Sequence, residues 1–168
     1  MAVAGTPAGD ERVPGGRPQR GDGARPAIVS FVYATPWDWS RMRADGAGYV
    51  LVVDDIAEQR DIYETIFTHA GLRVLEAQDG ETALSLARAH LPDVVLLDVC
   101  LPDLDGYEVI RRLKADERTR RISIVLLTAC ALPGDESARG AGYDEFLVKP
   151  IQPRDALAAV QRHLPIRA

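Results

Sequence analysis

The stretch "VVLLDVC" (residues 94–100) decides the fold, because it is an apolar run that stops on a carboxylate. Val94 to Leu97 show no alternation of apolar and polar residues, which is typical of a strand buried on both faces of a parallel sheet. An unpaired carboxylate is costly to bury. Asp98 is therefore either a turn residue at a strand end or a reactive group at the rim of a sheet.

Strand-like and helix-like segments alternate from residue 49 onward. We expect strands at 49–55, 73–77, 94–98, 122–128 and 143–149. We expect helices at 58–70, 79–90, about 107–114, 133–140 (short and weak) and 153–164. Helical spacing places one apolar stripe on the first helix and an inward face on the second; these are Ile62, Tyr63, Ile66, Phe67 and Ala70, and Ala83, Leu84 and Ala87. Such alternation predicts an α/β fold with a parallel sheet covered by helices on both faces. Right-handed crossovers make this a doubly wound open sheet, in which functional groups gather at the carboxyl ends of the strands.

Charge and cysteine content exclude several classes of protein. The chain has 168 residues and a net charge of −5, so a broad attraction to nucleic acid or to an anionic membrane is not expected. No apolar run approaches the roughly 20 residues that span a bilayer, and the N-terminus lacks the order of a secretory signal. The two cysteines, Cys100 and Cys130, fit a reduced, cytoplasmic protein better than a disulfide scaffold.

Composition changes near residue 46. Residues 1–46 hold 5 Pro and 7 Gly with a net charge of +1, whereas residues 47–168 carry a net charge of −6. We therefore expect a low-complexity, mostly disordered extension over 1–46 and one folded domain over 47–168. The apolar segment 27–42, which holds both tryptophans, is either a docking segment or a poorly ordered flank. A translation start at Met42 is a third interpretation.

Reactive side chains end four of the expected strands: Asp54 and Asp55, Asp98, Thr128, and Lys149. Each has an ordinary interpretation on its own, because aspartate forms turns, threonine is often structural and lysine is usually solvated. Their occurrence at one edge favours a site. Three carboxylates there would repel one another, and a divalent cation removes that conflict. Oxygen ligands in an intracellular protein favour Mg²⁺.

The chemistry that fits these groups is phosphoryl transfer. A carboxylate can act as a nucleophile and form an aspartyl phosphate. A hydroxyl, an ammonium group and Mg²⁺ can neutralise the phosphoryl oxygens. We therefore interpret Asp98 as the group that becomes phosphorylated.

Residues 49–165 resemble a receiver domain of bacterial two-component response regulators. The matching motifs are "VLVVDD" (50–55), "VVLLDVCLPDLDGYEVI" (94–110), "IVLLTA" (124–129) and "FLVKPI" (146–151). Asp55 and Asp98 are 43 residues apart, Asp98 and Thr128 are 30 apart, and Thr128 and Lys149 are 21 apart. The resemblance implies a flavodoxin-like, five-stranded parallel sheet with strand order 2-1-3-4-5.

The resemblance also implies the roles of the site residues. Asp98 would accept the phosphoryl group from a histidine kinase or a histidine phosphotransfer protein. The cofactor would be Mg²⁺, held by Asp54, Asp55, Asp98 and the backbone carbonyl of Cys100. Thr128 and Lys149 would contact phosphoryl oxygens.

Further features follow from the same resemblance. The Lys149–Pro150 peptide bond would be cis, and Pro102, Asp105 and Gly106 would shape the turn beside the site. Phe146 would be the switch residue, whose ring follows Thr128 inward on phosphorylation. The alternative is that Phe146 is an ordinary core aromatic.

These observations predict a stand-alone, bacterial response regulator, because only "PIRA" follows the last expected helix. Its output would be phosphorylation-dependent binding to a partner protein, as a monomer or a weak dimer, without nucleic acid or membrane. We expect a phosphoacceptor and not an enzyme, because Cys100 lies where related phosphatases carry a second aspartate. A phosphorylation-independent interaction domain and a fragment of a longer regulator are the alternatives. The basic stretch 111–121 is either a solvated surface or a docking site for an acidic partner.

Overall fold

The structure is a computed structural model that describes residues 46–129 and 140–165, all within one compact unit, Asp38–Ala168. Its elements are β1 (Tyr49–Val53), α2 (Ala57–His69), β2 (Arg73–Ala77), α3 (Gly80–His90), β3 (Val94–Asp98), α4 (Gly106–Ala115), β4 (Ser123–Thr128), β5 (Glu145–Val148) and α5 (Pro153–His163). The expected extension over 1–46 and the expected helix at 133–140 lie outside the described residues, apart from Gly46 and Gly140. Within the described part of the chain, every helix is too short or too polar to span a bilayer.

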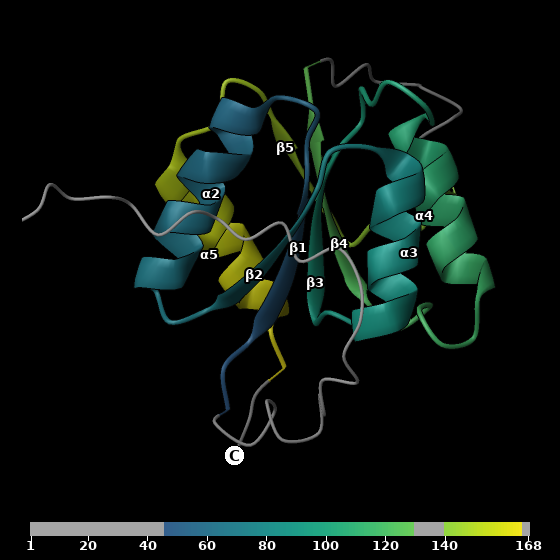
Figure 1. Cartoon of the computed structure of the whole chain (residues 1–168), viewed down its shortest axis with the longest axis horizontal. Helices are drawn as coiled ribbons and strands as arrows, with labels where there is room; N and C mark the ends of the chain where they lie inside the picture. The colour runs from purple at the N-terminus through teal and green to yellow at the C-terminus, as the bar shows by residue number, and fades with distance from the viewer. Residues whose placement is uncertain (1–45, 130–139, 166–168) are drawn as a thin grey trace, which may run out of the picture. The chain divides into compact units, whose positions relative to one another are not determined.

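The five strands form one parallel sheet in the order β2-β1-β3-β4-β5, which confirms the predicted fold class and strand order. β3 is central: Val94 pairs with Val50 of β1 on one side and with Ser123 of β4 on the other. Figure 1 shows α2 and α5 on one face of the sheet and α3 and α4 on the other. The sheet is therefore doubly wound, and the carboxyl ends of β1, β3, β4 and β5 meet at one edge.

The core has two halves because successive side chains of a strand point to opposite faces. In β1, Leu51 and Val53 pack with the buried residues of α3 and α4. Val50 and Val52 pack with α2 and α5 on the other face. The uninterrupted apolar strands thus supply both halves of the core at once, as expected for a parallel sheet between two helical layers.

The buried faces of the helices follow the predicted apolar positions, except at the outer edge and the end of α2. The inward residues predicted for 79–90 (Ala83, Leu84, Ala87) are all buried. In α2, Tyr63 and Phe67 are buried, but Ile62 is 47% exposed although it belongs to the same predicted apolar stripe. The stripe is wider than the surface that the sheet and α5 cover, so its outer edge faces solvent.

Gly106, the first residue of α4, lies where its backbone meets the end of β3. A Cβ atom there would lie 2.7 Å from the Cα of Val99 and 2.8 Å from the carbonyl oxygen of Asp98. We expect Gly106→Ala to lower the free energy of unfolding by about 2–3 kcal/mol, because backbone atoms must move to make room. Gly71 has φ +81° and open space around it, so Gly71→Ala meets no clash and only the cost of a positive φ. We expect it to lower the free energy of unfolding by about 1 kcal/mol. Urea unfolding of both variants measures this difference, and equal losses would contradict the steric argument.

Candidate functional site

Three aspartates come together at the carboxyl edge of the sheet. Asp54 and Asp55 directly follow β1, and Asp98 is the last residue of the neighbouring strand β3. One carboxylate oxygen from each lies within 4.8 Å of the other two. Asp54 is fully buried and Asp98 is nearly so, whereas Asp55 is exposed. The structure therefore assembles the acidic cluster that the sequence predicts.

Lys149 supplies the positive charge of the site. It directly follows β5, and its side chain reaches past β4 so that Nζ lies 2.8 Å from Asp98 Oδ2 and 3.3 Å from Asp54 Oδ2. Partial burial lowers the pKa of Lys149, but the hydrogen bond and charge of Asp98 and the charge of Asp54 raise it by more. The ammonium form is therefore favoured. The Lys149–Pro150 bond is cis, as predicted.

Asp54 is the carboxylate of the cluster whose ionised form is disfavoured by burial. Burial raises the pKa of its carboxyl, and the hydrogen bond from the Ile56 N–H and the charge of Lys149 only partly offset this. The Arg60 guanidinium donates to the Asp54 carbonyl oxygen at 2.6 Å. Arg60 was not predicted as a site residue, because its only signal in the sequence is a basic residue in the first turn of the helix after the motif.

Thr128 and Cys100 lie beside the charged groups. Thr128 ends β4 and is buried, and its carbonyl oxygen accepts from the Lys149 N–H at 2.8 Å. The Cys100 N–H points to Asp98 Oδ1 at a long 3.4 Å, and Cys100 itself is exposed. The end of β4 and the loop after β3 thus border the cluster from two sides.

A cleft of about 430 Å³ adjoins Lys149. It is lined by Gln59, Ile62, Tyr63, Lys149, Pro150, Ile151 and Pro153. Burial raises the pKa of the Tyr63 hydroxyl, so it stays protonated near neutral pH. The cleft therefore places a largely apolar surface next to the polar site.

Three of the six basic residues in the stretch 111–121 form ion pairs within the domain. Arg111 and Arg112 bind Glu108, and Lys114 binds Asp144. At these three residues the pairs favour a solvated, internally neutralised surface over a free docking site.

The acidic cluster fits a hard divalent cation. Three carboxylates supply oxygen ligands, and because burial raises the pKa of Asp54, a bound cation would stabilise its ionised form. The family model of the response regulator receiver domain matches residues 50–161. The chain belongs to this receiver family.

The relatives of this receiver differ in length. The response regulator PleD of Caulobacter vibrioides is 45% identical over 103 residues, which cover 61% of this chain and 23% of PleD. The chain thus spans about a quarter of PleD. The polar-differentiation response regulator DivK of Brucella ovis is 33% identical over 116 residues, which cover 68% of this chain and 94% of DivK.

A solved receiver shows the same architecture with a metal bound. The receiver domain of the sensor histidine kinase PA1611 from Pseudomonas aeruginosa has a magnesium ion coordinated in its active-site cleft. It is 35% identical to this chain, and the two superpose with a TM-score of 0.64. The match covers 70% of this chain and 97% of the PA1611 receiver domain.

The buried Asp54 carboxylate leads to a stability prediction. We expect Asp54→Asn to raise the free energy of unfolding by about 1–2 kcal/mol at pH 7 in EDTA, while Mg²⁺ binding is lost. The pKa of Asp54 is higher in the folded than in the unfolded chain, so ionisation disfavours folding. The gain should therefore grow as pH rises through the carboxyl range and level off above the folded-state pKa.

Urea unfolding between pH 5 and pH 8 measures this gain. The exposed Asp55 is the matched control, and Asp55→Asn should change stability by less than about 0.5 kcal/mol. A loss of stability in Asp54→Asn would show that its pairing with Lys149 outweighs its desolvation.

Proposed function

We propose that this receiver accepts a phosphoryl group on the Asp98 carboxylate from a histidine kinase or a histidine phosphotransfer protein, in a Mg²⁺-dependent reaction. The observation that carries the proposal is the position of Asp98 at the sheet edge, in contact with Lys149 and beside two further carboxylates. Such a group is a nucleophile held among charges that suit a phosphoryl group.

The transfer is a simple displacement. A carboxylate oxygen of Asp98 attacks phosphorus, the bond from phosphorus to the donor histidine nitrogen breaks, and the electron pair leaves with the imidazole. The Lys149 ammonium and the Thr128 hydroxyl bind the phosphoryl oxygens. Bound Mg²⁺ would neutralise the remaining charge. Its ligands would be Asp54, Asp55, Asp98 and the backbone carbonyl of Cys100.

The output is binding to a partner protein, and Phe146 is its switch. Phe146 is 48% exposed on β5, and its ring meets that of Tyr143 edge-on, with centroids 6.1 Å apart. This exposed position leaves the ring free to move inward when Thr128 turns toward the phosphoryl group. The half-exposed side chain of Phe146 does not fit the alternative that Phe146 is an ordinary core aromatic.

The wider proposal keeps the chain a signalling protein. It acts as a cytoplasmic, bacterial regulator, with residues 1–46 as an extension and 47–168 as the receiver. The match covers 94% of the length of DivK, so DivK is a relative that consists of little more than a receiver domain. The residue two positions past Asp98 is Cys100 and not a carboxylate, so this position supplies no general acid for turnover of a foreign substrate.

The test is incubation of the full chain with acetyl phosphate and Mg²⁺, followed by intact mass. We expect a gain of one phosphoryl mass that EDTA prevents. Borohydride reduction should then map the acyl phosphate to the peptide that contains Asp98. No gain, or a gain independent of Mg²⁺, would overturn the proposal.

A further inference from the structure

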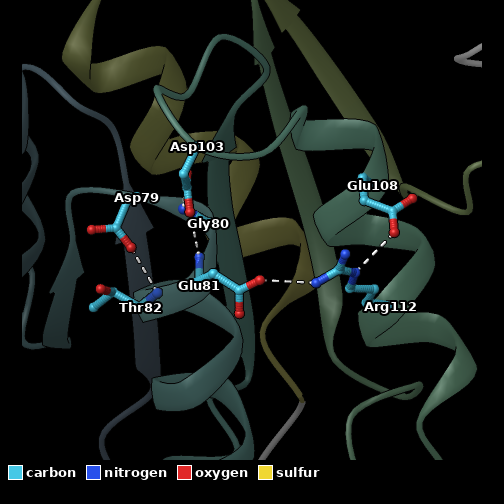
Figure 2. Close-up of polar contacts among 7 residues, drawn as sticks. All are labelled: Asp79, Gly80, Glu81, Thr82, Asp103, Glu108 and Arg112. Carbon is cyan, nitrogen blue, oxygen red and sulfur yellow. Dashed lines mark hydrogen bonds and ion pairs between the residues drawn. The ribbon is translucent and has the colours of Figure 1, made fainter.

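Asp103 ties the loop between β3 and α4 to a distant helix. Its Oδ1 accepts the backbone N–H of Gly80 at 2.8 Å, and its Oδ2 accepts that of Glu81 at 2.9 Å. Figure 2 shows both groups at the amino end of α3, facing the Asp103 carboxylate. Gly80 and Glu81 are the first two residues of α3. One loop side chain therefore caps both.

The two bonds are charge-assisted. The first N–H groups of a helix have no partner within the helix and lie at its positive end, so a carboxylate binds there favourably. Slight burial raises the pKa of the Asp103 carboxyl, but the hydrogen bonds from Gly80 and Glu81 lower it by more. Asp103 is consequently ionised at neutral pH, when the bonds are strongest.

The loop also lies directly on the helix end. A Cβ atom on Gly80 would come within 2.9 Å of the Leu104 Cβ and of the Val109 Cγ2. Glycine at this position allows Leu104 to approach, next to the Asp103 bonds. The same loop segment is thus held by polar bonds and by close packing.

A side-chain network continues from the capped end toward α4. Glu81, whose N–H donates to Asp103, binds Arg112 of α4 at 2.9 Å through its own carboxylate. Arg112 binds Glu108 at 2.8 Å in turn (Figure 2). The loop, α3 and α4 are therefore joined at one place.

The ends of the loop are fixed separately. The Val99 N–H donates to Leu127 of β4 at 3.0 Å, and the Gly106 N–H donates to the Val99 carbonyl oxygen at 2.9 Å. Cys100 lies between these ends and the Asp103 anchor. The backbone at Cys100 is therefore held on one side by the Val99 hydrogen bonds and on the other by Asp103.

We propose that Asp103 is a positioning residue that holds this loop against α3 and so sets the place of the Cys100 backbone carbonyl relative to Asp98. The inference rests on the proposed function, in which that carbonyl and Asp98 bind Mg²⁺. Loss of the anchor lets the middle of the loop move, and the carbonyl leaves the position that the metal requires.

The chain offers a matched control at the same helix end. Asp79 caps α3 by accepting the Thr82 N–H at 2.7 Å, but it precedes the helix and does not belong to the loop. Asp103→Ala and Asp79→Ala each remove a carboxylate cap from the same helix end. The two variants should lose similar stability, and only Asp103→Ala should affect the metal site.

The experiment is titration of the full chain with MgCl₂ by calorimetry, without phosphodonor. We expect Asp103→Ala to raise the Mg²⁺ dissociation constant about tenfold, as removal of an outer-shell partner does. Asp79→Ala should change it less than twofold. In metal-free protein, amide hydrogen exchange of the loop 99–105 should accelerate in Asp103→Ala alone. Asp103→Asn, which keeps one acceptor oxygen, should show a smaller rise and serves if the alanine variant does not fold.

The outcomes separate this inference from the proposed function. Equal dissociation constants for Asp103→Ala and Asp79→Ala, with normal phosphoryl uptake by the wild type, overturn the inference alone. A wild type that binds Mg²⁺ but takes up no phosphoryl group overturns the proposed function alone. A wild type that binds no Mg²⁺ at millimolar concentration overturns both.

Discussion

Replacing Asp98 with asparagine is expected to reduce phosphoryl uptake from acetyl phosphate at least about a thousandfold. Asparagine has nearly the shape of aspartate, but its amide oxygen is not a nucleophile. The substitution also removes the charge that Lys149 Nζ contacts at 2.8 Å. Intact mass after timed incubation with Mg²⁺ measures the effect.

Asp93→Asn is the matched control for this variant. Asp93 immediately precedes β3, at the opposite end of the strand from Asp98, where its carboxylate accepts the Tyr49 N–H at 2.9 Å. The control should keep wild-type uptake. Phosphoryl gain at the wild-type rate in Asp98→Asn would place the acceptor elsewhere.

Lys149→Met is expected to lower the rate of phosphoryl uptake by about 10²–10³, the effect of removing one preorganised donor from a transition state. The ammonium contacts both Asp98 and Asp54, so in the proposed reaction it would lie where charge develops on the transferred oxygens. Methionine keeps an unbranched, flexible side chain in place of the stem and removes only the charge and its hydrogen bonds.

The control for Lys149→Met is Lys114→Met. Lys114 also bridges distant elements, since its Nζ binds the Ile122 carbonyl oxygen and Asp144, but these partners lie outside the acidic cluster. Its uptake rate should stay within about twofold of the wild type. Initial rates at saturating Mg²⁺ distinguish the two lysines, and equal rates would remove Lys149 from the phosphoryl site.

The strand pattern predicted the sheet well because a parallel sheet between two helical layers needs uninterrupted apolar strands. β2 and β3 begin and end at the residues expected from "RVLEA" and "VVLLD". The cluster of Asp54, Asp98 and Lys149 was predictable for a related reason. Parallel strands bring their carboxyl ends to one edge, so residues far apart in sequence must meet there.

Arg60 and Asp103 escaped the sequence analysis because their partners are backbone atoms. Arg60 binds the Asp54 carbonyl oxygen, and Asp103 binds two helix N–H groups. Every residue offers a backbone carbonyl oxygen and every residue except proline a backbone N–H, so these groups leave no pattern of side chains to recognise. Ile62 was misplaced for a different reason, because periodicity predicts a face of a helix and not how far its neighbours extend over it.

The capping of α3 by a residue 23 positions downstream has a consequence for the order of folding. Until Asp103 reaches the helix end, two of the first amides of α3 lack this partner, and a short isolated helix is marginal. We therefore expect α3 to gain its full stability only together with the segment that follows β3.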